Sequence, residues 1–285
     1  MELIEEGHTA GAFFVVILLA LIVYAIAKRG GFFRLPPPTR FHPVTFFHAF
    51  GAFLVYLILG LFLSQLFLLL TQKQVLGVLL KGWLQLLSLA CIFIALIIYC
   101  SLINSKVSRV IFWGEKQRSA KRFFKGLAMG LLAYLVSYPV VLLVQLIAGL
   151  ISEYVWGKIE VEQVAVEQLK KTLHRPALFV SMVFFVVVLV PFMEELLFRG
   201  FLQSFLKRYL KRGWAILLTA FLFALVHFAP SQGAGNFQLI LSLFALSLFL
   251  GFIYEREQCL WAPLALHMTF NGLSVLFIVV QSTAS

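Results

Sequence analysis

Apolar stretches of about 20 residues, each long enough to cross a bilayer as a helix, follow one another along most of this chain. The chain is 62% hydrophobic and 12% charged, which leaves too little polar surface to solvate a globule of 285 residues. We therefore predict an all-α, polytopic membrane helix bundle with about eight transmembrane helices. The expected spans are 9–27, 46–70, 83–103, 126–150, 177–198, 213–230, 236–253 and 261–280.

The 23 Lys and Arg residues give a formal net charge of +11, yet they follow the membrane and do not indicate a nucleic-acid partner. About 16 of them fall near 28–45, 104–125, 199–212 and 254–260, and about 6 fall in the alternate connections. The positive-inside rule predicts that these basic connections are cytoplasmic and that both termini lie outside the cell membrane. The first apolar run has the acidic flank MELIEEGHTA, which predicts a retained helix and not a cleaved signal peptide.

The distribution of ionisable residues between connections and apolar runs changes near residue 175. Before it they lie in connections, whereas after it they lie within or beside apolar runs. We therefore predict an N-terminal transmembrane region, 1–175, with about four helices and no assigned role, and a C-terminal core, 176–285, with about four more. Between them, apolar residues at 161, 165, 169 and 173 predict a short amphipathic helix, which the sequence leaves open as outer-face decoration or as a lid.

The stretch PFMEELLFRG, residues 191–200, places two carboxylates and an arginine in an apolar span. Charged groups are costly there and usually serve a function. Adjacent helical residues point about 100° apart, while Glu195 and Arg199 are four residues apart on one face. This spacing predicts a structural ion pair between Glu195 and Arg199. Glu194 is then without a local ion-pair partner in the sequence pattern. Pro191 lacks a backbone N–H and is expected to disturb the helix beside it.

Two later spans carry polar residues at a similar depth. His227 ends the run FLFALVH, and the basic turn at 207–213 would bring it near Glu194 if the two helices form a hairpin. His267 and Asn271 are four residues apart and share one face of the last helix. A carboxylate with an imidazole can deprotonate water, and an imidazole with an amide can donate to an oxyanion. These are the parts of a hydrolase.

Other intramembrane peptidase chemistries fit the sequence less well. The chain contains no aspartate, which excludes an aspartyl dyad, and no HExxH motif typical of one class of zinc proteases. Two non-enzymatic alternatives remain beside a glutamate mechanism. One is a peptide-binding or immunity-type protein with the same fold, and the other is an ion-coupled transporter that uses Glu194.

Three ordered motifs resemble a known family. They are EExxxR at Glu194–Arg199, FxxxH at Phe223–His227 and HxxxN at His267–Asn271. Together with the approach CLWAPLALH, they are similar to the CAAX protease and bacteriocin-processing family of intramembrane glutamate endopeptidases. The resemblance covers about 177–275, and the residues before it match no family.

The resemblance implies a role for each motif residue. Glu194 and His227 would activate the water, His267 and Asn271 would form the oxyanion hole, and Glu195 with Arg199 would support them. It implies a peptide or protein substrate at the membrane and no cofactor. Zinc held by Glu194, His227 and His267 is the second possibility. The metal-free reading is preferred because Asn271 is a poor zinc ligand and a good oxyanion donor. The sequence names neither the substrate nor the oligomeric state.

Overall fold

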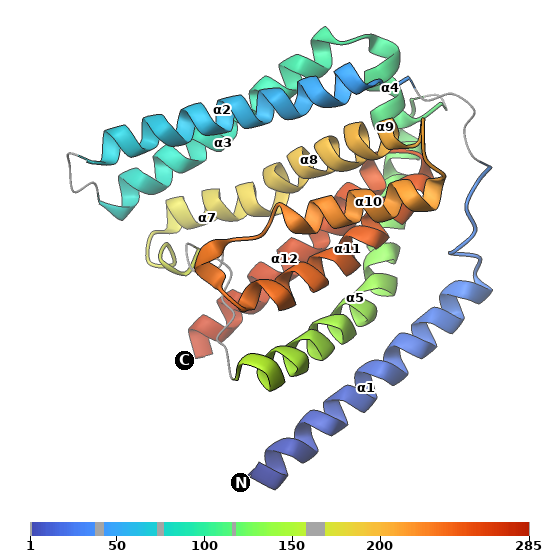
Figure 1. Cartoon of the computed structure of the whole chain (residues 1–285), viewed down its shortest axis with the longest axis vertical. Coiled ribbons are helices and arrows are strands. Elements are labelled where there is room, and N and C mark those ends of the chain that lie inside the picture. Colours follow the sequence, from blue (N-terminus) through green and yellow to red (C-terminus); the bar gives the residue numbers. More distant parts are fainter. Residues whose placement is uncertain (1, 38–42, 73–76, 116–117, 158–168, 285) are drawn as a thin grey trace.

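The computed structural model describes residues 2–37, 43–72, 77–115, 118–157 and 169–284. Within these ranges the regular elements are helices, and none is a strand, so the all-α prediction is confirmed. The long helices lie side by side as a bundle, with the α2–α3 pair at one edge and α1 at the opposite edge (Figure 1). The long elements are α1 (Glu2–Arg29), α2 (Phe46–Gln72), α3 (Val78–Leu102), α5 (Ala120–Trp156), α11 (Gly235–Glu257) and α12 (Trp261–Ala284).

Six of the described helical stretches are long and apolar enough to cross a membrane, which fits a multi-pass membrane protein. The predicted number of eight is approximate. The first predicted run, 9–27, falls within α1. Two further elements, α4 (Ser105–Trp113) and α10 (Arg212–Leu225), are short. The six stretches are Phe46–Leu70, Leu79–Leu102, Ala120–Trp156, Pro176–Leu206, Gly235–Glu257 and Trp261–Ser282.

The run predicted at 213–230 differs most from its expectation. Helix α10 has 14 residues and spans about 21 Å, less than the roughly 30 Å hydrocarbon core of a bilayer. It stops because the chain turns at Pro230 and Gly233, where Asn236 at the start of α11 binds both the N–H and the carbonyl of Ala229.

The helix that carries the two central glutamates is continuous but irregular. It runs through α7 (Pro176–Phe184), the π-helical turn η1 (Phe185–Leu189), α8 (Val190–Glu195), the π-helical turn η2 (Leu196–Gln203) and α9 (Ser204–Leu206). Short π-helical segments inside α-helices are often found at functional sites. Pro191 lies directly after the first of them, so the disturbance expected at this residue is present in the structure.

The two halves of the chain pack against each other. Helix α5 contacts α1 on one side and α11 and α12 on the other. A Cβ at Gly130 would meet the carbonyl oxygen of Ala262 and lie 2.6 Å from the Cβ of Ala265, so α5 and α12 are in direct backbone contact. The predicted boundary near residue 175 thus rests on the sequence pattern and does not correspond to a gap between these helices.

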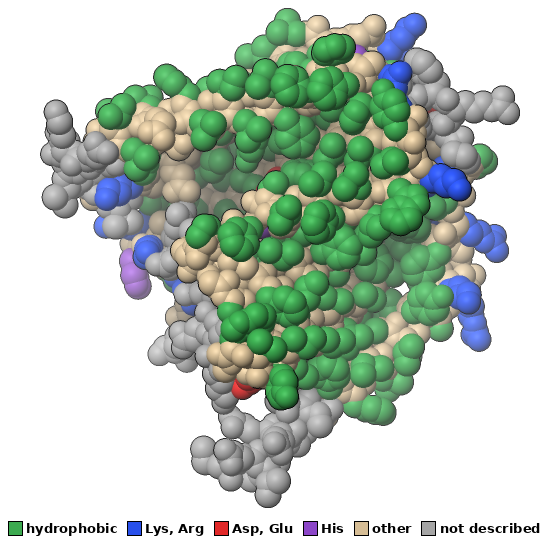
Figure 2. Space-filling model, viewed as in Figure 1, with side chains coloured by type: hydrophobic (Ala, Val, Ile, Leu, Met, Phe, Trp, Pro, Cys, Tyr) green, Lys and Arg blue, Asp and Glu red, His purple; other side chains and the backbone are tan. Residues whose placement is uncertain are grey.

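The surface matches a lipid environment. Hydrophobic side chains cover the face of the molecule in Figure 2, while Lys and Arg side chains gather mainly at the edge near α4 and the α9–α10 turn. Such a division is expected for an apolar belt with a basic end. The amphipathic helix predicted around residues 161–173 falls largely on 158–168, which lie outside the described residues.

Candidate active site

Glu194 of α8 lies between two imidazoles from other helices. Its Oε1 is 3.6 Å from Nε2 of His227, just beyond α10, and its Oε2 is 3.6 Å from Nε2 of His267 on α12. Side-chain exposures are 20% for Glu194, 29% for His227 and 5% for His267, so the carboxylate is accessible while one imidazole is nearly buried. The structure thus places Glu194, His227 and His267, three of the residues that the sequence put at a similar depth, side by side.

The opposite ring nitrogen of each histidine is held by an acceptor. His227 Nδ1 is 2.8 Å from the carbonyl oxygen of Phe223, which can only accept, so Nδ1 carries the hydrogen. His267 Nδ1 is 2.8 Å from Glu195 Oε1 and donates to that carboxylate. Both rings are therefore oriented with Nε2 toward Glu194.

Glu195 has two partners and not one. Its Oε1 accepts from Arg199 Nη1 at 2.8 Å, as the i,i+4 spacing predicts, and from His267 Nδ1. Glu195 and Arg199 are both fully buried. The ion pair thus also holds the imidazole of His267, a link between residues 72 positions apart that no local pattern in the sequence indicates.

Arg199 extends this network to two more helices. Its Nη2 donates to Ser247 Oγ of α11 at 2.6 Å, and its guanidinium lies 4.5 Å from the ring centroid of Phe223 on α10. Cation–π contacts of this kind stabilise a desolvated guanidinium. Ser247 did not emerge from the sequence, because a lone serine in an apolar helix has no distinguishing spacing.

Asn271 closes a gap in the backbone hydrogen bonding of the irregular helix. In η1 the N–H of Val190 donates to the carbonyl of Phe185, five residues earlier. By the same spacing the carbonyl of Val186 would accept from residue 191, but Pro191 has no N–H. Asn271 Nδ2 donates to this carbonyl at 3.0 Å instead. Asn271 therefore has a structural partner as well as a place on the same helix face as His267.

The donor atoms around Glu194 are of a kind that zinc accepts. Metal-bound histidines usually donate their other ring N–H to a carboxylate or a carbonyl, as both histidines do here. Among the described residues, however, no group of three or more His, Cys or Glu side chains is arranged to hold a metal ion. The donor set fits zinc in chemistry, and its atoms are not gathered around one position.

Residues 176–273 match the model of a protein family described as type II CAAX prenyl endopeptidase Rce1-like. This segment is therefore similar to that family. The match confirms the resemblance predicted from the three motifs and covers about a third of the chain.

A curated relative extends the comparison. Over 115 residues the chain is 32% identical to UPF0177 protein YaiF of Lactococcus lactis subsp. lactis (strain IL1403). This alignment covers 40% of the chain and 47% of the relative, so the chain spans about half of that protein's length. No solved structure matches the chain.

The six predicted site residues lie inside the matched segment, whereas part of the packing around the helix of Glu194 comes from outside it. Phe53 of α2 packs edge-on against Phe198, with ring centroids 5.6 Å apart. Phe93 of α3 packs similarly against Phe192, at 5.5 Å. The N-terminal helices therefore position the helix that carries Glu194, although their sequence lies outside the family match.

Proposed function

We propose that this chain is an intramembrane glutamate endopeptidase, which hydrolyses a peptide bond in a peptide or protein segment presented at the membrane. The observation that carries the proposal is the placement of the Glu194 carboxylate 3.6 Å from the Nε2 atoms of both His227 and His267. These separations are longer than good hydrogen bonds, so neither imidazole is locked onto the carboxylate. Both imidazoles can therefore interact with a water and a scissile amide that are bound beside Glu194. The Rce1-like match supports this class of reaction.

In the first step Glu194 acts as general base. It takes a proton from a water, and the oxygen of that water forms a bond to the carbonyl carbon of the substrate. His227 holds its Nδ1–H on the carbonyl of Phe223, so its Nε2 presents a lone pair that accepts a hydrogen bond from the same water. The water is thus oriented by two acceptors on two different helices.

Attack of the water oxygen turns the substrate carbonyl oxygen into an oxyanion. In the second step this oxyanion receives hydrogen bonds from His267 and Asn271 of α12. Because Nδ1–H of His267 is donated to Glu195, its Nε2 carries a hydrogen only when the ring is an imidazolium. The proposal therefore requires a protonated His267, with Glu195 as its counter-ion. Asn271 Nδ2 has two hydrogens, of which one is held by Val186 and the other can donate to the oxyanion.

In the third step the tetrahedral intermediate collapses. The C–N bond breaks, and the proton taken up by Glu194 passes to the departing amine nitrogen. The net reaction adds one water across the peptide bond. Glu195 and Arg199 touch no reacting atom, and we assign them as positioning residues.

Zinc hydrolysis is the second candidate, favoured by the orientation of both Nε2 atoms toward one carboxylate. Glu194, His227 and His267 would hold the ion, which would act as a Lewis acid on the water. A serine nucleophile is disfavoured. Ser274 follows Gly272 in a GxS arrangement, but it is exposed and its Oγ donates to the carbonyl of Phe270.

The deciding experiment is peptide-library cleavage by the purified protein, with products read by mass spectrometry. Glu194→Gln keeps size and polarity but removes the base, so we expect turnover to fall by about 10²–10⁴-fold with an unchanged melting temperature. Ser274→Ala and Glu153→Gln, an exposed glutamate of α5, are the matched controls and should cleave like the parent. A fully active Glu194→Gln variant refutes the proposal.

The same assay separates the non-enzymatic alternatives. A peptide-binding or immunity protein would retain library peptides without new termini, and the Glu194→Gln variant would retain them too. An ion-coupled transporter would show Glu194-dependent ion flux in vesicles and no cleavage. Cleavage that depends on Glu194 contradicts both.

A further inference from the structure

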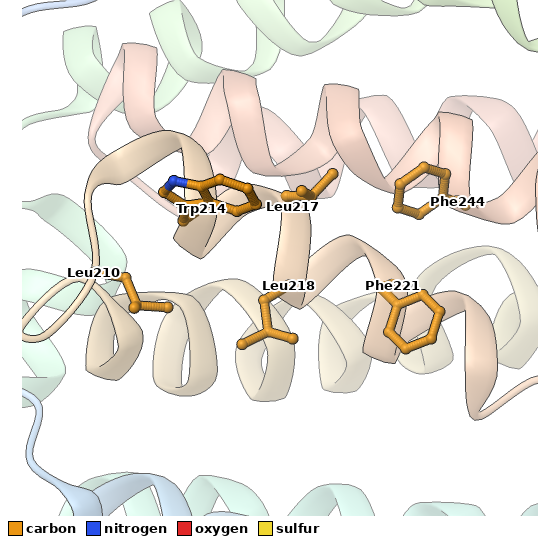
Figure 3. Close-up of a pocket in the computed structure, with 6 residues that line it drawn as sticks. All are labelled: Leu210, Trp214, Leu217, Leu218, Phe221 and Phe244. Atoms are coloured by element: carbon orange, nitrogen blue, oxygen red, sulfur yellow. The ribbon is translucent and has the colours of Figure 1, made fainter.

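An apolar groove lies along an exposed face of α10 and shares no lining residue with the candidate active site. Its volume is about 470 Å³ (Figure 3). Trp214 is 63% exposed and Phe221 is 51% exposed, so the groove walls are open to the surroundings of the bundle. The residues that line it are Leu210, Trp214, Leu217, Leu218, Phe221 and Phe244.

The end of this groove at Leu210 carries a cluster of cations. Lys207, in the turn before α10, has its Nζ 2.8 Å from the buried carboxylate of Glu255 on α11, and Arg212, the first residue of α10, has its Nε 3.4 Å from the same carboxylate. These two cations are therefore neutralised in part by one glutamate. Lys211 is exposed and has no ion-pair partner among the described residues. Lys211 thus adds an exposed cation directly after Leu210 in the chain, one of the residues that line the groove.

The groove and the cation together indicate the chemistry of a ligand. The apolar walls favour a hydrocarbon chain, and Lys211 favours an anionic group at one end of it. Along α10 the lining runs from Trp214 to Phe221, a rise of about 10 Å, and Leu210 extends it into the turn before the helix. A volume of 470 Å³ is in the range of small-molecule pockets.

We propose that this groove binds one anionic phospholipid, with an acyl chain along Leu218 and Phe221 and the phosphate group at Lys211. Trp214, three residues beyond Lys211, then lies at the level between head group and chain where tryptophan is enriched in membrane proteins. The site differs from the general lipid shell in having a shaped apolar wall and a cation without a carboxylate partner. The proposal does not rest on the peptidase activity.

Native mass spectrometry of the delipidated, detergent-solubilised full chain tests the site with two probes, dioleoylphosphatidylglycerol and dioleoylphosphatidylcholine. We expect one tightly retained phosphatidylglycerol and weaker retention of phosphatidylcholine. Lys211→Gln should reduce the preference for phosphatidylglycerol by about fivefold, the effect of one surface cation on an anionic lipid. Leu218→Trp fills the groove and should abolish the tight retention of phosphatidylglycerol and lower the retention of phosphatidylcholine.

Two variants control for effects elsewhere on the surface. Lys121→Gln removes an exposed cation at the start of α5, and Leu135→Trp enlarges a leucine of α5 that is 62% exposed. Both should retain phosphatidylglycerol like the parent. Equal losses in test and control variants, or no preference for phosphatidylglycerol in the parent, would mean that only the general lipid shell is present and would overturn the proposal. Melting temperatures without added lipid exclude misfolding, since all four variants are expected to match the parent.

Discussion

The contact between Asn271 and the carbonyl of Val186 makes a prediction that separates structure from catalysis. Asn271→Ala leaves this carbonyl without a donor, because Pro191 cannot provide one. A fully buried acceptor without a partner costs about 1–3 kcal/mol, this contact is partly buried, and interhelical hydrogen bonds in membrane proteins average about 0.6 kcal/mol. We expect a loss of about 1–2 kcal/mol, or about 2–8 °C in the melting midpoint in detergent.

A second substitution at Pro191 restores the missing donor. Pro191→Ala supplies a backbone N–H at the position from which the π-helical spacing would reach Val186. In the Asn271→Ala background it should therefore recover most of the lost stability. The two substitutions would then be coupled by about 1 kcal/mol or more, as expected for residues that share one partner. Thr269→Ala on the same helix, which loses only a bond to its own helix, is the matched control and should combine additively with Pro191→Ala.

Peptide cleavage by the same variants tests the oxyanion role. If Asn271 stabilises the oxyanion, the stable double variant should still be about 10²–10³-fold slower than Pro191→Ala alone. A double variant that is as active as Pro191→Ala would make Asn271 a structural residue only. A double variant no more stable than Asn271→Ala would refute the backbone argument itself.

Four further predictions concern the ion pair, helix packing, the metal and the topology. Glu195→Gln leaves Arg199 buried without its counter-ion, so we expect a loss of about 3–5 kcal/mol. Replacing both residues with alanine should be milder in thermal unfolding, yet remain slow in cleavage because His267 has lost its acceptor. Gly130→Ala should cost about 1–3 kcal/mol because the new methyl group meets backbone atoms of α12. Gly149→Ala, which meets only the flexible end of a glutamine, should be nearly neutral in the same assay. Cleavage should survive o-phenanthroline; full loss that zinc reverses would favour the metal site. A Ser119→Cys variant should resist a membrane-impermeant thiol reagent in intact cells, and its labelling would reverse the predicted orientation.

Local spacing predicted the candidate site to the extent that its contacts are local. Glu195 and Arg199 are four residues apart, so a helix alone brings them together. Glu194 and His227 could be placed at one depth because a short turn joins their helices and residue rise is constant. The link from Glu195 to His267 and the contact of Arg199 with Ser247 could not be foreseen, because each depends on how two distant helices rotate about their own axes.

The sequence by itself determined that the chain forms apolar helices, since a polypeptide in lipid must satisfy its backbone hydrogen bonds within each segment. It also determined which helices carry the polar motifs. Only the tertiary structure decided where the helices deviate from regularity. Helix α10 ends early because Asn236 binds the backbone of the turn, and the π-helical turn before Pro191 is completed by Asn271 from α12. In both places a side chain from another element replaces a backbone donor or acceptor, and such a replacement depends on packing between helices and not on the sequence of either one.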